Sequence, residues 1–144
     1  MRPITEQTIS LDLPSALESV RVLHAIISEL LRLMGLDEQT AIDVNLAVVE
    51  AGTNAIKHGN QEEAHKRAHF DFIIRPGQFI VVVRDEGPGF NREQVPSPLE
   101  GDNFFKSSGR GIFLMESCMD EVTFEQSGTV IKMVKHLKPE TVGS

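Results

Sequence analysis

The chain has 144 residues, 40% of them hydrophobic and 24% charged, which are the proportions of an ordinary single globular domain. Its 14 basic and 21 acidic residues leave a formal net charge of −7, which disfavours nonspecific binding to nucleic acid or to an anionic membrane. Cys118 is the only cysteine, so a disulfide within the chain and a cysteine metal cluster are excluded. We expect one domain over residues 1–138 and a flexible tail over 139–144.

The start of the chain lacks the basic segment and apolar run of a secretory signal, and no apolar run approaches membrane-spanning length. These features predict a cytoplasmic protein. Together with the acidic balance they predict that neither a membrane nor nucleic acid is a partner.

The first two predicted elements are a strand and a helix. Residues 4–13 alternate apolar and polar side chains, which predicts a strand that Pro14 ends. Ser15 then precedes a helix that we expect to end near Gly35. The apolar face of this helix recurs at helical spacing through Leu17, Val20, Leu23, Ile27, Leu30 and Leu31.

A second helix is predicted to begin after Asp37, which can cap its first turn, and to close at Gly59-Asn60. Apolar side chains cover most of its circumference, so we expect it to be buried on most sides. They form two adjacent stripes, one of Ile42, Leu46 and Val49 and one of Val44, Val48, Ala51 and Ala55.

The second half of the chain is predicted to hold four strands and one helix. Residues 68–75 and 79–84 are predicted to pair across the turn residues Pro76-Gly77. The stretch 86–108 is too long for an ordinary connection and predicts a functional loop. The last predicted elements are a helix and two strands joined at Ser127-Gly128, over about 109–118, 121–126 and 129–136.

One polar stripe interrupts the second helix, so that face must border a polar cavity. Its members on a 3.6-residue period are Asp43, Ala47, Glu50, Asn54 and Lys57 or His58. Glu50 and Asn54 lie one turn apart, with Cβ atoms roughly 5–6 Å from each other. The Asn54 amide oxygen suits Mg²⁺, which keeps several waters and takes phosphates as further ligands, while Glu50 addresses a neighbouring water or hydroxyl. Alternatively, Asn54 caps the helix end and Glu50 is a solvated surface residue.

A second candidate follows the strand over 79–84. Asp85 stands at the end of that strand, before a turn that Gly87 and Gly89 bend. A carboxylate there can accept a hydrogen bond from the exocyclic amino group of adenine, and glycines without a Cβ let the backbone approach the base. The alternative is an ordinary Asp-x-Gly turn, which is common.

A glycine pair opens the last predicted helix. Gly109 and Gly111 flank Arg110 and precede apolar residues, so free backbone N–H groups at the helix start would point at phosphate oxygens. Lys106 and Arg110 add positive charge where terminal phosphates would lie. The alternatives are a helix N-terminus with flexible caps and a solvated basic loop.

Three stretches together carry a family resemblance. They read Glu-Ala-Gly-Thr-Asn-Ala-Ile-Lys-His-Gly over 50–59, Asp-Glu-Gly-Pro-Gly-Phe over 85–90, and Ser-Gly-Arg-Gly-Ile-Phe-Leu-Met over 108–115. In this order they resemble the ATPase domain of the GHKL superfamily, and within it the small anti-sigma factor serine/threonine kinases. The resemblance covers nearly the whole chain.

The resemblance implies an α+β fold, a two-layer α/β sandwich with helices packed on one face of a mixed, mostly antiparallel sheet. ATP would lie between the helices and a lid at about residues 91–108, with Mg²⁺ as cofactor. Glu50 would be the general base, Asn54 the Mg²⁺ ligand and Asp85 the adenine contact. The other implied nucleotide contacts are Gly87, Gly89, Gly109, Gly111, Ser108, Lys57, His58, Lys106 and Arg110. His58 alternatively only closes its helix.

Kinases of this branch bind a sigma factor, or transfer the γ-phosphoryl of ATP to a serine of an anti-anti-sigma protein of the STAS type, usually as homodimers. The resemblance implies the same partners here. A first-helix arginine often serves the partner-binding surface in this branch, and Arg21 matches it; the alternative is an ordinary surface arginine. Some relatives carry an arginine that reaches the terminal phosphate where this chain has Ser107. Lys106 or Arg110 would have to substitute for it, or transfer would be slow.

Two other functions remain open at this point. The chain could be a non-catalytic ATP-binding module that captures and releases a regulator, or a detached histidine kinase ATPase domain. The helix around His24 continues the apolar pattern of the domain itself, which favours a surface or core-edge histidine over a phosphate acceptor.

Overall fold

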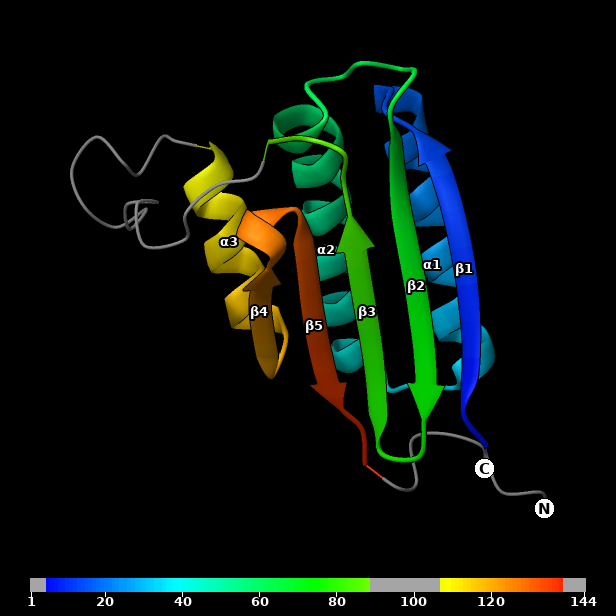
Figure 1. The fold of residues 1–144 in the computed structure, drawn as a ribbon. Coiled ribbons are helices and arrows are strands. Elements are labelled where there is room, and N and C mark those ends of the chain that lie inside the picture. Colours follow the sequence, from blue (N-terminus) through cyan, green and yellow to red (C-terminus); the bar gives the residue numbers. More distant parts are fainter. Residues whose placement is uncertain (1–4, 89–106, 139–144) are drawn as a thin grey trace.

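A computed structural model describes residues 5–88 and 107–138, and it arranges them in two layers (Figure 1). One layer is a five-stranded sheet, and the other consists of helices that cover one of its faces. This confirms the predicted two-layer α+β architecture. The predicted lid at 91–108 lies almost wholly, and the predicted tail at 139–144 wholly, outside the described residues.

The sheet has the strand order β1-β2-β3-β5-β4. Its strands are β1 (Gln7–Pro14), β2 (Arg67–Arg75), β3 (Gln78–Arg84), β4 (Glu121–Glu125) and β5 (Val130–His136). Every pairing between these strands is antiparallel, so the expectation of a mixed sheet is wrong in this detail. The inward face carries three fully buried rings, and Phe72 stacks with both Phe70 and Phe79.

Two long helices pack against that inward face. Helix α1 (Leu17–Met34) ends at Gly35, whose backbone is left-handed at φ 70° and whose N–H donates to Arg32 O. Helix α2 (Glu38–Thr53) begins after Asp37, whose side chain accepts a hydrogen bond from the Thr40 N–H at 3.2 Å. The predicted C-terminal end of α1 at Gly35 and the predicted start of α2 after Asp37 are therefore confirmed.

Helix α2 does not end in an ordinary turn. It continues into the π-helical turn η1 (Asn54–Gly59), which closes with the Asn60 N–H donating to Ala55 O at 2.8 Å. A π turn is rare and is frequent at functional sites. The sequence predicts the end of this helix at Gly59-Asn60 but not its widened last turn.

The third helix, α3 (Ser107–Cys118), packs beside α2, and Cys118 is buried in the core as its apolar surroundings predict. In Figure 1 the C-terminal end of α2, the end of β3 and the beginning of α3 all lie at the upper end of the sandwich. Each of the three motifs of the sequence therefore has residues at one end of the fold. Within the described residues, no helix combines the length and the hydropathy that crossing a membrane requires.

Candidate functional site

The end of η1 and the turn after β3 are in direct contact. A Cβ added at Gly59 would lie 2.4 Å from Asp85 Cγ, and a Cβ added at Gly87 would lie 1.9 Å from the carbonyl oxygen of Gly59. Such distances leave no room for a side chain at either glycine. The motifs at 50–59 and 85–90 therefore meet in space, at the residues where each has a glycine.

Helix α3 packs against both α2 and the π turn that follows it. Glu50, on the last turns of α2, is half-buried, and a Cβ added at Gly111 would lie 3.2 Å from Glu50 Oε2. The backbone of α3 thus passes close to this carboxylate because Gly111 has no side chain. Gly111 itself is buried.

Asn54 is the first residue of η1 and is only 9% exposed. It follows Glu50 by one turn, so a carboxylate and a carboxamide lie on neighbouring turns beside the glycine contacts. These oxygen donors fit Mg²⁺, which takes few protein ligands and completes its shell with water and phosphate. The described residues contain no group of three His, Cys, Asp or Glu side chains able to hold a metal, so a cation here would need such outside ligands.

The lower part of the predicted polar stripe does not belong to this site. The Asp43 carboxylate lies 3.8 Å from Lys135 Nζ of β5 and accepts a hydrogen bond from Gln39 at 2.9 Å. Ala47 is fully buried. The prediction that one polar cavity borders the whole stripe is therefore wrong, because Asp43 pairs with β5 and Ala47 lies in the core, while Glu50 lies against Gly111 of α3.

Asp85 is held in a defined environment. Its Oδ1 accepts a hydrogen bond from the Gly87 N–H at 2.8 Å, and its own N–H donates to Thr129 O at 3.0 Å. Burial raises the pKa of Asp85, and the Gly87 hydrogen bond and the charge of Lys66 oppose that rise. A partly desolvated carboxylate at the end of a strand is suited to accept a hydrogen bond from a ligand.

Lys57 and His58 lie on η1, between Asn54 and Gly59. Lys57 is exposed. Desolvation, and then the charge of Lys57, lower the pKa of His58, which favours the neutral imidazole at pH 7. Both side chains belong to the same turn as the glycine contact, as the sequence predicts.

The remaining predicted nucleotide contacts are placed only in part. Arg110 is exposed on α3, and Ser108 and Gly109 lie in the first turn of that helix. Gly89 and Lys106 lie outside the described residues.

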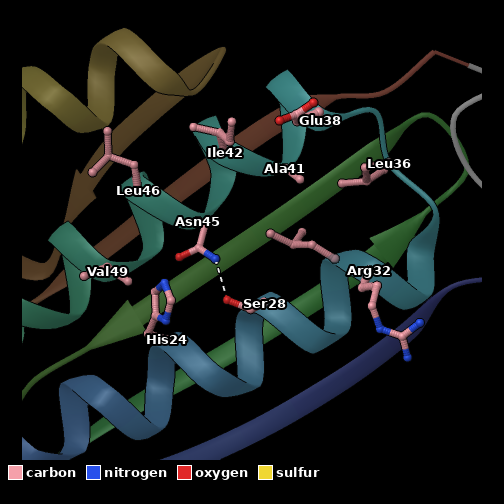
Figure 2. A pocket seen from close by; sticks show the side chains of 11 residues that line it. His24, Ser28, Arg32, Leu36, Glu38, Ala41, Ile42, Asn45, Leu46 and Val49 are labelled. Atoms are coloured by element: carbon pink, nitrogen blue, oxygen red, sulfur yellow. Dashed lines mark hydrogen bonds between the residues drawn. The ribbon is translucent and has the colours of Figure 1, made fainter.

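Arg21 lies on a different part of the molecule. It is exposed on α1, which packs against α2 rather than beside α3. His24, one turn further along α1, is also exposed and lines a groove of about 590 Å³ between α1 and α2 (Figure 2). Mostly apolar side chains line this groove, among them Ile42, Leu46 and Val49. Glu50, Asn54 and Asp85 are not among its lining residues, so it is separate from the glycine contacts.

The sequence pattern misses Asn60 as a site residue and predicts only that it helps to close the helix. In the structure it is fully buried and hydrogen-bonded to the residue that follows Asp85. A polar residue directly after a helix-closing glycine is the only signal in the sequence, and many solvated loops share it.

Known proteins are similar to this chain over nearly its whole length. A model of the family described as histidine kinase-like ATPase domain matches residues 13–135. The serine-protein kinase RsbW of Staphylococcus epidermidis is 33% identical over 146 residues, covering 96% of this chain and 92% of the relative. The protein of the same name from Staphylococcus aureus (strain bovine RF122) is 32% identical over 145 residues, with coverage of 95% and 91%.

A solved structure shares the fold. The RsbU and RsbW domains of a Mycobacterium tuberculosis protein superimpose with a TM-score of 0.63 at 15% identity. The match covers 92% of this chain and 32% of the other, so this chain spans about a third of that longer protein.

Proposed function

The chain belongs to the histidine kinase-like ATPase domain family and is an ATP-dependent serine-protein kinase. We propose that Glu50, Asn54 and Asp85 form its ATP site. The observation that carries the assignment is the close approach of backbone and side chains at Gly59, Gly87 and Gly111. Gly59 and Gly87 leave no room beside Asp85 and its turn, and Gly111 brings α3 against Glu50. Three stretches distant in sequence thus line one place, as a nucleotide with a base and phosphates requires.

We propose that Asp85 reads the adenine base. Its carboxylate can accept the exocyclic amino group, and the turn after it carries glycine at Gly87, which lets the backbone come close. Gly89, Ser108, Gly109 and Gly111 would complete the backbone around the nucleotide, with Lys57 and His58 at the helix end. Lys106 or Arg110 would supply positive charge for the terminal phosphate, where Ser107 replaces the arginine of some relatives.

Asn54 would hold Mg²⁺ through its amide oxygen, and the cation would supply charge neutralisation for the phosphates. Glu50 would accept the proton of the attacking serine hydroxyl, because it is the half-buried carboxylate one turn from Asn54. The close approach of the α3 backbone at Gly111 would limit where this carboxylate can point. The protein thereby orients the base before the acceptor arrives.

The proposed partners follow from the relatives. They are a STAS-domain anti-anti-sigma protein as phosphoryl acceptor and a sigma factor or analogous regulator that the kinase sequesters. We further propose a cytoplasmic homodimer that regulates transcription. Arg21 is the proposed partner contact, since it is exposed on α1 and free of the cluster around Glu50.

Phosphorylation with γ-labelled ATP tests this proposal. The chain is incubated with Mg²⁺ and a STAS-domain protein encoded in the same genome, and we expect acid-stable label on a serine of that protein. Label that acid removes would indicate phosphohistidine and a histidine kinase ATPase domain. Saturable ATP binding without any labelled acceptor would favour the non-catalytic switch.

A further inference from the structure

We propose that Asn60 is a positioning residue for adenine recognition, because its buried side chain holds the turn that carries Asp85. The proposal rests on the proposed role of Asp85 as the adenine contact. Asn60 is fully buried, and its amide oxygen accepts a hydrogen bond from the Glu86 N–H at 2.7 Å. It therefore acts on the residue directly after Asp85 and does not itself touch the nucleotide.

Both N–H groups and the oxygen of the Asn60 amide are hydrogen-bonded. Its Nδ2 donates to Ser15 Oγ at 2.7 Å and to Arg67 O at 3.0 Å, while its oxygen accepts from Glu86. These partners fix the orientation of the amide, because Arg67 O needs a donor and the Glu86 N–H needs an acceptor. A buried amide with all these bonds satisfied is a rigid support.

The four segments that meet at Asn60 are far apart in the sequence. Ser15 precedes α1, Arg67 begins β2, Glu86 follows β3, and Asn60 itself ends η1. Two further bonds reinforce the junction, since the Ser15 N–H donates to Lys66 O at 3.1 Å and the Arg67 N–H donates to the Glu86 carboxylate. The turn after β3 is thus fastened on one side by Asn60 and on the other by the bond from the Asp85 N–H to Thr129 O at 3.0 Å.

The π turn explains why Asn60 reaches this position. The i to i−5 bond from the Asn60 N–H to Ala55 O widens the last turn of the helix, so Asn60 follows a backbone path that an α turn would not give. On that path Gly59 lies against Asp85 and Asn60 lies beside Glu86. One local change in the helix therefore places Gly59 against the Asp85 carboxylate and Asn60 against the backbone of the following residue.

The test compares ATP with inosine triphosphate. The base of inosine triphosphate carries a carbonyl group in place of the amino group that would donate a hydrogen bond to Asp85. Calorimetric titration of the full chain with each nucleotide, in the presence of Mg²⁺, gives the preference for ATP. For Asn60→Ala we expect this preference to fall by about tenfold, mainly through weaker binding of ATP. A general loosening of the fold would weaken the binding of both nucleotides alike, because they share the ribose and the triphosphate.

Two companion variants keep the test decisive. Ser15→Ala removes one acceptor of Asn60 but leaves the bond to Glu86, so it should lower the preference by a smaller factor, and it remains informative if Asn60→Ala does not fold. Asn45→Ala is the matched control, because Asn45 lies on α2, outside the turn at Asn60, and likewise donates to a serine, Ser28 Oγ, at 2.8 Å (Figure 2). It should leave the preference unchanged.

The outcomes separate the two proposals. If the parent chain binds ATP and inosine triphosphate equally, the role of Asp85 fails and the inference fails with it. If the parent prefers ATP and Asn60→Ala keeps that preference in full, the inference alone is overturned. A loss of preference in Asn45→Ala equal to that in Asn60→Ala would also overturn it, since the effect would not be specific to the turn.

Discussion

Helix α2 begins with the cap from Asp37 to the Thr40 N–H, whereas it ends in a π turn with Asn54 and Asn60 buried. The first end uses an exposed carboxylate to satisfy the free N–H groups of the helix, as many helices do. The last end buries polar groups and admits no side chain at Gly59. The N-terminal end of α2 thus has the features of an ordinary helix cap, while its C-terminal end holds the residues proposed to bind the nucleotide.

The sharpest test of this contrast is Glu50→Gln at the functional end. The amide cannot accept the serine proton, so we expect phosphoryl transfer to fall by about 100-fold or more. ATP affinity should change little, because the replacement has nearly the same shape. Single-turnover labelling of the acceptor, with calorimetry for ATP, measures both quantities. Transfer at the native rate would remove Glu50 as the base.

Gly87→Ala should also act at the functional end. The added Cβ would lie 1.9 Å from Gly59 O, so the turn or the helix end must move, and we expect ATP affinity to fall by at least about tenfold. Gly77→Ala is the matched control. It places a side chain at φ 78° in the turn between β2 and β3, where nothing lies within 4 Å of the added Cβ. It should lower stability yet leave ATP affinity intact.

Asn54→Ala is expected to have a more selective effect. Removal of the amide oxygen should reduce ATP affinity by about tenfold when Mg²⁺ is present. The effect should be much smaller when EDTA removes the metal, since the remaining nucleotide contacts are unchanged. Equal losses under the two conditions would show that Asn54 does not act through the metal.

Asp85→Asn should separate binding from stability. Burial raises the pKa of Asp85 above its unfolded value of about 3.9, so the folded state favours the protonated carboxyl, and the free energy of unfolding falls as pH rises through the folded pKa. The neutral variant avoids this cost. We expect it to be more stable than the parent at pH 7, with the difference shrinking as pH falls toward the unfolded pKa of the carboxyl.

Urea unfolding of the two proteins from pH 4 to pH 7, without nucleotide, measures that difference. The same variant should bind ATP more weakly, because an amide presents one acceptor oxygen instead of two. A variant that is less stable than the parent at pH 7 would contradict the proposed cost of burying this charge.

The smallest effect is expected at the other end of α2. Asp37→Ala removes the cap, which should lower the melting temperature by about 2–4 °C. ATP affinity and transfer should stay at the parent values. A substantial loss of ATP binding would show that the two ends of the helix are not independent.

The sequence predicts the elements and much of the site because the signals are local. Glu50 and Asn54 lie one turn apart on an otherwise apolar helix, and Gly35 and Asp37 mark helix ends through well-known backbone preferences. Asp85 is predicted because a strand ends directly before it. Each of these signals lies within a few residues of the feature that it predicts.

The features that the sequence does not predict depend on distant residues. Asn60 acquires its role from Ser15, 45 residues away, and from Glu86, 26 residues away, and neither separation leaves a pattern. The cover over Asp43 comes from Lys135 on the last strand. Strand directions in the sheet likewise follow from which strands become neighbours, and strand periodicity alone does not specify that.

The contacts at Gly59, Gly87 and Gly111 also bear on how the chain folds. They join stretches that are tens of residues apart, so the proposed nucleotide site forms only after these distant stretches have met, which is a slow class of event. An intermediate with α1 and α2 paired but α3 undocked would lack affinity for the nucleotide. Ligand added to a refolding chain should therefore slow unfolding far more than it accelerates folding.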